Sequence, residues 1–161
     1  MQRIKSYKGF SFGKGELDGI QKSILKRSVS GTWEINGETG LIDIEGSYDH
    51  ISILSLSGLK FGNISGDFVC SDNINILNCT GFPLSVGGDF IAAGNKISSL
   101  RGAPKQVGGI YSVAGNSLKS LEGCPTKTGT FNCNKNYLTT LHGSPEIIQG
   151  SFTCAQTAFK I

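Results

Sequence analysis

The sequence predicts a mainly β fold: a short right-handed β-solenoid with units of about 21 residues and an irregular or short-helical N-terminal cap. A Gly-x-aromatic motif recurs along the chain, and several other residue columns keep register with it. The composition agrees, with 23 glycines against four prolines in 161 residues and only 17% charged residues. Such a chain turns too often for a helical bundle, and at 38% hydrophobic residues it is too apolar for a disordered linker.

The Gly-x-aromatic motif sets the repeat. Its aromatic residues lie 20 to 22 positions apart, and a small apolar residue follows two positions after five of them. The spacing of two positions is the side-chain period of a short, half-buried strand. Such a strand cannot bury its apolar face unless consecutive units stack. The segment Gly31-Thr32-Trp33 is a candidate irregular first member. The stacked rings are predicted to be Tyr48, Phe68, Phe90, Tyr111, Phe131 and Phe152. The small apolar residues two positions later, predicted to face inward as well, are Cys70, Ala92, Val113, Cys133 and Cys154.

Three further columns complete each unit. An asparagine lies five positions after the aromatic in four units, where its amide is placed to bond backbone groups of its own and the neighbouring coil. Paired apolar positions then predict a second buried ridge, and a Gly-x-Pro corner turns the chain back. The members are Asn73, Asn95, Asn116 and Asn136; Ile76 with Cys79, Ile97 with Leu100, Leu118 with Leu121 and Leu138 with Leu141; and, after each corner, Val86, Val107, Thr128 and Ile148.

Two of these units, residues 95–104 (NKISSLRGAP) and 116–125 (NSLKSLEGCP), resemble the short leucine-rich-type repeats of tailed-bacteriophage proteins. The resemblance covers roughly residues 46–161, so we divide the chain into a basic cap region, 1–45, and a repeat solenoid, 46–161. It implies a phage-encoded protein that acts in the host cytoplasm or the virion and that presents a surface to a partner. It transfers no active-site residue.

The cap region carries most of the excess positive charge. Residues 1–30 hold seven basic and two acidic side chains. Within residues 15–27 the apolar side chains Leu17, Ile20, Ile24 and Leu25 have roughly helical spacing, with acids in the first turn and bases in the last, which predicts a short helix or irregular cap over the first coil. Nucleic-acid binding through Lys22, Lys26 and Arg27 is therefore one rival hypothesis.

The sequence contains no recognisable catalytic or metal-binding motif. None of the five cysteines forms a Cys-x-x-Cys pair, and three share the inward column, which favours core packing over zinc. The Gly-Gly pairs recur with the repeat and precede strands, so we interpret them as turns rather than phosphate loops. We predict no catalytic residue, no metal and no cofactor. The N-terminus lacks a secretory apolar region, which with the free thiols predicts a soluble, cytoplasmic protein.

The leading functional hypothesis is a non-enzymatic protein-binding module, a phage factor that inhibits or redirects a host protein, including a defence protein. A virion structural component and a nucleic-acid-binding protein are the alternatives. We place the partner surface on outward positions of the two ridges, because only these vary in chemistry, and self-association on the apolar final coil. The candidate residues are Val69, Ile91 and Ile110 on the first ridge, Arg101, Glu122, Tyr137 and His142 near the second, and Phe159 on the final coil.

Overall fold

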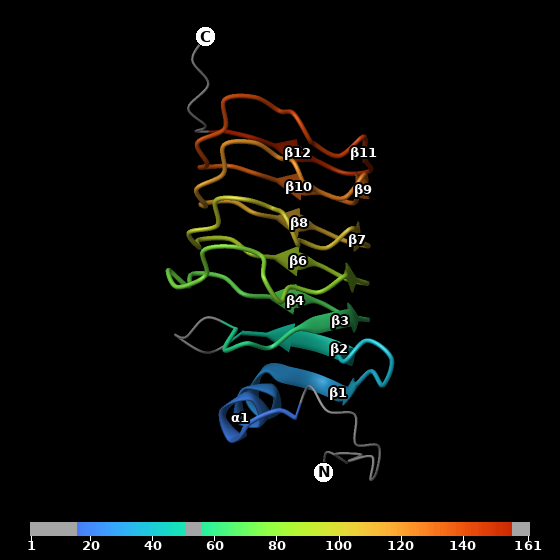
Figure 1. The fold of residues 1–161 in the computed structure, drawn as a ribbon. Coiled ribbons are helices and arrows are strands. Elements are labelled where there is room, and N and C mark those ends of the chain that lie inside the picture. The colour runs from blue at the N-terminus through green and yellow to red at the C-terminus, as the bar shows by residue number, and fades with distance from the viewer. Residues whose placement is uncertain (1–15, 51–55, 156–161) are drawn as a thin grey trace.

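A computed structural model describes residues 16–50 and 56–155. The chain forms an elongated stack of coils with α1 (Gly19–Ser28) and β1 (Val29–Ile35) at one end (Figure 1). β2 (Ile42–Asp49) and β3 (Phe61–Ile64) follow. The remaining strands have two residues each: β4 (Phe68–Val69), β5 (Ser85–Val86), β6 (Phe90–Ile91), β7 (Gln106–Val107), β8 (Tyr111–Ser112), β9 (Lys127–Thr128), β10 (Phe131–Asn132), β11 (Ile147–Ile148) and β12 (Phe152–Thr153).

The coil strands form two columns of parallel strands, which confirms the predicted β-solenoid. The first column runs β2-β4-β6-β8-β10-β12 and the second β2-β3-β5-β7, continued by the pair β9 and β11. β2 belongs to both columns, because Tyr48 near its end pairs with Phe68 of β4 while Ile42 at its start pairs with Phe61 of β3. The two columns therefore diverge from one strand.

The aromatic column is confirmed as the interior of the stack. Ring centroids of successive members lie 5.3 Å apart for Tyr48 and Phe68, 5.8 Å for Phe68 and Phe90, and 5.7 Å for Phe131 and Phe152. Every ring from Tyr48 to Phe131 is fully buried, whereas Phe152 on the last described coil is 41% exposed. The parallel register places the rings one above another, so their packing joins the coils along the whole axis.

The asparagine column has the predicted structural role. The Asn116 side chain is buried, and its Nδ2 donates to the carbonyl oxygens of Val113 in its own coil (3.0 Å) and Ala92 in the preceding coil (2.8 Å). Its Oδ1 accepts the N–H of Ile97, also in the preceding coil, at 3.0 Å. Asn95 and Asn136 make the same kinds of contact. Each asparagine therefore satisfies buried backbone groups that the turn leaves without strand partners.

The cap differs from the prediction in detail. The helix spans Gly19–Ser28 rather than 15–27, because Asp18 is its N-cap and forms a capping box with Gln21. Its first turn therefore holds no acid, although Lys26 and Arg27 lie in the last turn as predicted. Ile20, assigned to the apolar face, is 62% exposed. This helix is too short to cross a membrane, and no other helix occurs in the described residues.

The hairpin of β1 and β2 corrects one further prediction. β1 runs antiparallel to β2, with Gly31 opposite Gly46 and Trp33 opposite Ile44, so Gly31-Thr32-Trp33 is not an early parallel coil. The proposed boundary between residues 45 and 46 falls inside β2. At the other end Leu141, predicted to be buried, is 41% exposed, because no described coil lies beyond it to cover its side chain.

The ring column provides a test of the fold. Replacing Phe131, which lies between the rings of Tyr111 and Phe152, by alanine is expected to lower the free energy of unfolding by about 3 kcal/mol or more, because the stack cannot collapse around the cavity. Urea denaturation measures this change. Phe152→Ala is the matched control and is expected to cost clearly less, because Phe152 is half exposed. Equal costs for the two variants would contradict the arrangement.

Candidate functional site

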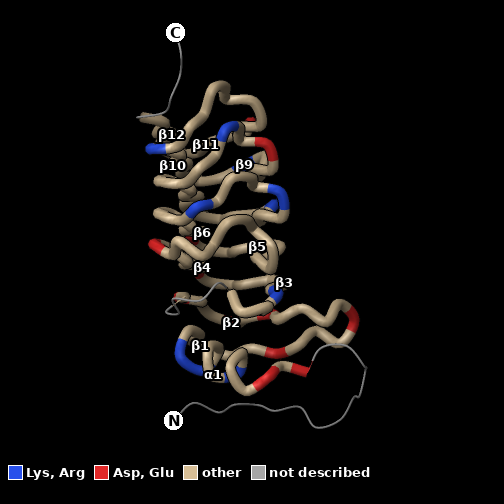
Figure 2. The backbone as a smooth tube through the Cα atoms, turned by 60° about the vertical axis from the view of Figure 1, so that its left-hand side comes forward, with Lys and Arg blue, Asp and Glu red and all other residues tan. Residues whose placement is uncertain are grey.

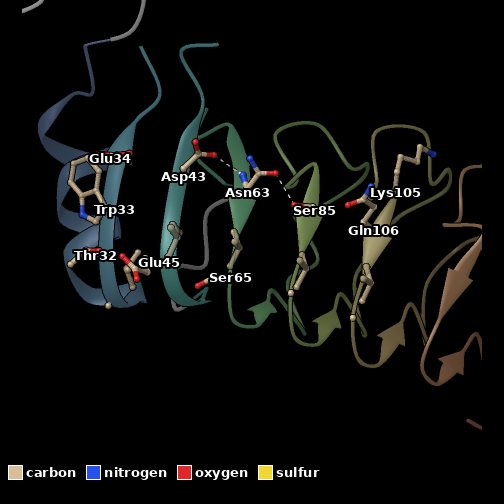
Figure 3. A pocket seen from close by; sticks show the side chains of 18 of the residues that line it. Thr32, Trp33, Glu34, Asp43, Glu45, Asn63, Ser65, Ser85, Lys105 and Gln106 are labelled. Carbon is tan, nitrogen blue, oxygen red and sulfur yellow. Dashed lines mark hydrogen bonds between the residues drawn. The ribbon is translucent and has the colours of Figure 1, made fainter. Parts of the chain in front are cut away.

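A groove of about 1670 Å³ runs along the second strand column, from α1 and the β1–β2 hairpin to the coil of β11. Figure 3 shows the side chains that line it, projecting from consecutive strands of that column. Outward and inward positions alternate along each strand, so the residue before each buried valine or isoleucine faces outward. The groove is therefore lined by one outward side chain from each coil together with its neighbours, which include the inward apolar residues Ile64, Val86 and Val107.

These outward side chains form a continuous row, which we call the polar row. Glu34 lies opposite Asp43, Asn63 opposite Ser85, and Ser85 opposite Gln106. The repeat places the next member one coil further along, on β9, the neighbour of β7. In order along the axis, the polar row is Glu34, Asp43, Asn63, Ser85, Gln106 and Lys127.

Hydrogen bonds order the first half of the polar row (Figure 3). Asp43 accepts the backbone N–H of Asn63 at 2.7 Å through Oδ1 and the Asn36 side-chain amide at 2.9 Å through Oδ2. The Ser85 hydroxyl donates to Asn63 Oδ1 at 2.7 Å. The Asn63 Nδ2 group and the whole Gln106 amide make no hydrogen bond to another described residue, and both residues are exposed. These two amides retain donor and acceptor capacity for a ligand.

Glycines keep the groove open beside the polar row. Gly87 and Gly108 follow the inward residues Val86 and Val107, and both line the groove. A Cβ atom at Gly87 would overlap the carbonyl oxygen of Ser65, and one at Gly108 would overlap the carbonyl oxygen of Gly87. The close approach of successive coils thus requires glycine here, and the absence of side chains leaves the groove hollow.

The charges that line the groove change sign along its length. Glu34, Asp43 and Glu45 line its first end on the β1–β2 hairpin, and Lys105 and Lys127 line the coils of β7 and β9. Figure 2 shows acidic positions on the hairpin, and both basic and acidic positions on the later coils. Lys105 Nζ donates to the carbonyl oxygen of Gly123 at 2.6 Å, whereas Glu34, Glu45 and Lys127 make no side-chain hydrogen bond or ion pair with another described residue. The strand residues that line the groove therefore change from acidic on the hairpin to basic on the later coils, and Lys22 and Lys26 of α1 also line the hairpin end.

The predicted first-ridge surface is wrong in part. Val69 and Ile91 are half-buried rather than exposed, and Ser112, expected to face outward in the same row, is 6% exposed. The parallel register stacks these side chains directly on one another, so each is covered by its neighbours above and below. Ile110 is 38% exposed, but it lies at a corner where its N–H donates to Asp89 Oδ1. No continuous apolar patch forms on this ridge.

The remaining predicted residues fall in three places. Arg101, Glu122, Tyr137 and His142 are exposed, as predicted, but none of them lines the groove. Lys22 and Lys26 of α1 do line it, and Arg27 does not, its Nε donating instead to the carbonyl oxygen of Ser23. Phe159 and the proposed self-association coil lie outside the described residues.

The sequence contains a signal for the groove beside the buried columns. The residue before each inward valine or threonine of the second column is polar: Ser85, Gln106 and Lys127. Glu34 and Asp43 extend this row but carry no such signal, because they lie on the hairpin that precedes the parallel coils.

The buried thiols and histidine contribute to packing. Burial raises the pKa of the Cys79 and Cys124 thiols to about 12, and burial likewise raises the pKa of Cys70 and Cys133. His50 is buried, with its Nδ1 2.7 Å from the Tyr48 hydroxyl. The described residues contain no group of three His, Cys, Asp or Glu side chains arranged to hold a metal ion.

Comparison of the chain with protein-family models, with curated proteins and with solved structures gives no match.

The glycine requirement can be tested directly. Gly108→Ala is expected to lower the free energy of unfolding by about 1–3 kcal/mol, because the new methyl group overlaps a backbone oxygen that cannot move without separating two coils. Gly37→Ala is the control, since a Cβ there has no atom within 4 Å, and it should leave stability within about 0.5 kcal/mol of the parent. Urea denaturation of the parent and the two variants measures these free energies of unfolding. A Gly108→Ala protein as stable as the parent would contradict the close approach of successive coils.

Thiol reactivity is expected to follow the raised pKa values. A thiol reacts as the thiolate, so Cys79 and Cys124, with pKa about 12 instead of 9, hold about 10³-fold less of the reactive form at pH 8 than an ordinary thiol. Alkylation of these residues in the folded protein should be slow at pH 8 and should accelerate as the pH rises toward 12. Peptide mass mapping after timed iodoacetamide treatment measures this, with the urea-unfolded chain as control. Rapid modification of Cys79 in the folded protein at pH 8 would refute the assignment.

Proposed function

We propose that this chain is a non-enzymatic protein-binding module and that a segment of its partner lies in the groove along the second strand column. The polar row carries the proposal: six outward side chains in one line, drawn from the hairpin and four successive strands, with two amides that retain unused hydrogen-bonding capacity. The strand backbone holds these groups at a regular spacing, so a ligand that matches the spacing can contact several of them at once.

Binding explains the lining better than catalysis does. The ionisable groups of the groove are carboxylates and lysines distributed along its length. Catalysis would instead need a nucleophile or a general base held beside a group that orients it. A row of amide, hydroxyl and charged groups suits recognition of a long partner surface.

The chemistry of the groove also bears on the alternatives. Three carboxylates, Glu34, Asp43 and Glu45, line one end against two lysines, Lys22 and Lys26 of α1. This end therefore lacks the excess of positive charge that a phosphate backbone needs, so a protein is favoured over a nucleic acid. The resemblance to tailed-phage repeats supports a host or phage protein as the partner, including a defence protein, and the five free cysteines are consistent with action in the cytoplasm. A virion component remains the second candidate, favoured by the same resemblance.

Site-specific photocrosslinking tests the proposal. A photoreactive amino acid placed at Gln106, in the groove, is expected to crosslink a discrete protein from the lysate of the source cell. The same amino acid at Thr139, an exposed turn position that does not line the groove, is the matched control and should not capture that protein.

Two further measurements make the result decisive. Gln106→Arg is expected to reduce capture of the identified protein at least tenfold, and Thr139→Arg should leave capture unchanged, with both variants first shown to melt like the parent. Equal crosslinking from the two positions, or full binding by Gln106→Arg, would refute the groove as the binding site.

A further inference from the structure

We infer that the occupant of the groove is an extended peptide segment that carries a basic and an acidic residue about four to six positions apart, with the basic residue at the β1–β2 end. This inference rests on the proposed protein-binding function and specifies which kind of segment the groove selects.

The order of charges gives the orientation. Glu34 and Glu45 line the groove from opposite strands of the hairpin and have no charged partner among the described residues, so a basic side chain of the ligand is favoured there. Lys127 is likewise unpaired among the described residues, and with Lys105 it favours an acidic side chain on the coils of β7 and β9. Lys22 and Lys26 line the groove from α1, so we expect the basic residue to lie against the strands rather than the helix.

Strand spacing sets the separation of the two ligand charges. From β2 the second column passes β3 and β5 to β7, and then reaches β9. At ~4.8 Å per strand, the three or four steps from Glu45 on β2 to β7 or β9 span about 14 to 19 Å, and an extended chain that rises ~3.3 Å per residue covers this distance in about four to six residues.

The middle of the polar row suits a peptide backbone. Asn63 and Gln106 present amide donors and acceptors between the charged ends, and both types of group match the N–H and C=O of an extended chain, which has no internal hydrogen bonds. A nucleic acid would meet the carboxylates of the hairpin. A neutral oligosaccharide would use the amides but would gain nothing from the opposite charges at the two ends.

A peptide-display selection tests the inference. A random nonapeptide library is selected on the full immobilised chain at low ionic strength. Peptides enriched on the parent protein are expected to carry Lys or Arg and Asp or Glu four to six positions apart in one preferred order. Neutralising either charge in the best peptide should weaken binding by about threefold, as for exposed ion pairs, and 0.5 M salt should weaken it similarly.

A charge-reversed protein is the decisive variant. In the quadruple variant Glu34→Lys, Glu45→Lys, Lys105→Glu, Lys127→Glu, the enriched order of the basic and acidic residues should invert. The matched control reverses two exposed charges that do not line the groove, Arg101→Glu and Glu122→Lys, and should retain the parent's preference. If the quadruple variant fails to fold, the neutral variant Glu34→Gln, Lys127→Gln is used and should lose the charge preference.

The outcomes separate this inference from the function on which it rests. Peptides that bind the parent, are lost with Gln106→Arg and show no charge spacing would overturn the inference and leave the groove as a protein-binding site. An unchanged order on the charge-reversed protein would overturn it as well. If oligothymidylate or maltohexaose binds in the groove and no selected peptide loses binding with Gln106→Arg, both the inference and the proposed protein-binding function would be overturned.

Discussion

The short, fixed distance between neighbouring coils is the constraint on which the rest of this structure depends. Most of the strands are only two residues long, so backbone pairing alone joins the coils weakly. Ring stacking, with centroids 5.3 to 5.8 Å apart along much of the column, and buried asparagine bridges supply what the short strands lack. Ring stacking and asparagine bridges both require side chains to repeat in register. This requirement explains why the sequence is periodic where the structure is buried.

The same spacing shapes the exterior. Where coils approach most closely, as at Gly87 and Gly108, no side chain fits between a strand and the carbonyl oxygen of the preceding coil. The groove is thus a by-product of packing, hollowed by glycines that the stack needs for its own stability. The members of the neighbouring polar row are free to differ in residue type, because their side chains point outward.

This division explains how much could be read from the sequence. The aromatic, asparagine and apolar columns were predictable, because each must recur about every 21 residues for one coil to fit the next. The site was not, since outward residues such as Asn63, Ser85 and Gln106 share no residue type and reveal a row only when their strand register is known. The carboxylates of the groove lie on an antiparallel hairpin outside the parallel repeat, so the repeat does not predict them. The exposure predicted for Val69 and Ile91 was wrong because alternation along one strand takes no account of side chains in adjacent coils that cover them.

The direction of the side-chain bonds between coils has a consequence for how the chain acquires its structure. Asn116 reaches back to Ala92 and Ile97, and Asp67 and Asp89 present carboxylate oxygens to backbone N–H groups that arrive later in the chain. Each coil is therefore completed by the one that follows it, on a template already in place. β2, which starts both columns, is the first such template, so ordering can spread from the hairpin towards the C-terminus during synthesis, with each new coil exposing only one unfinished edge at a time.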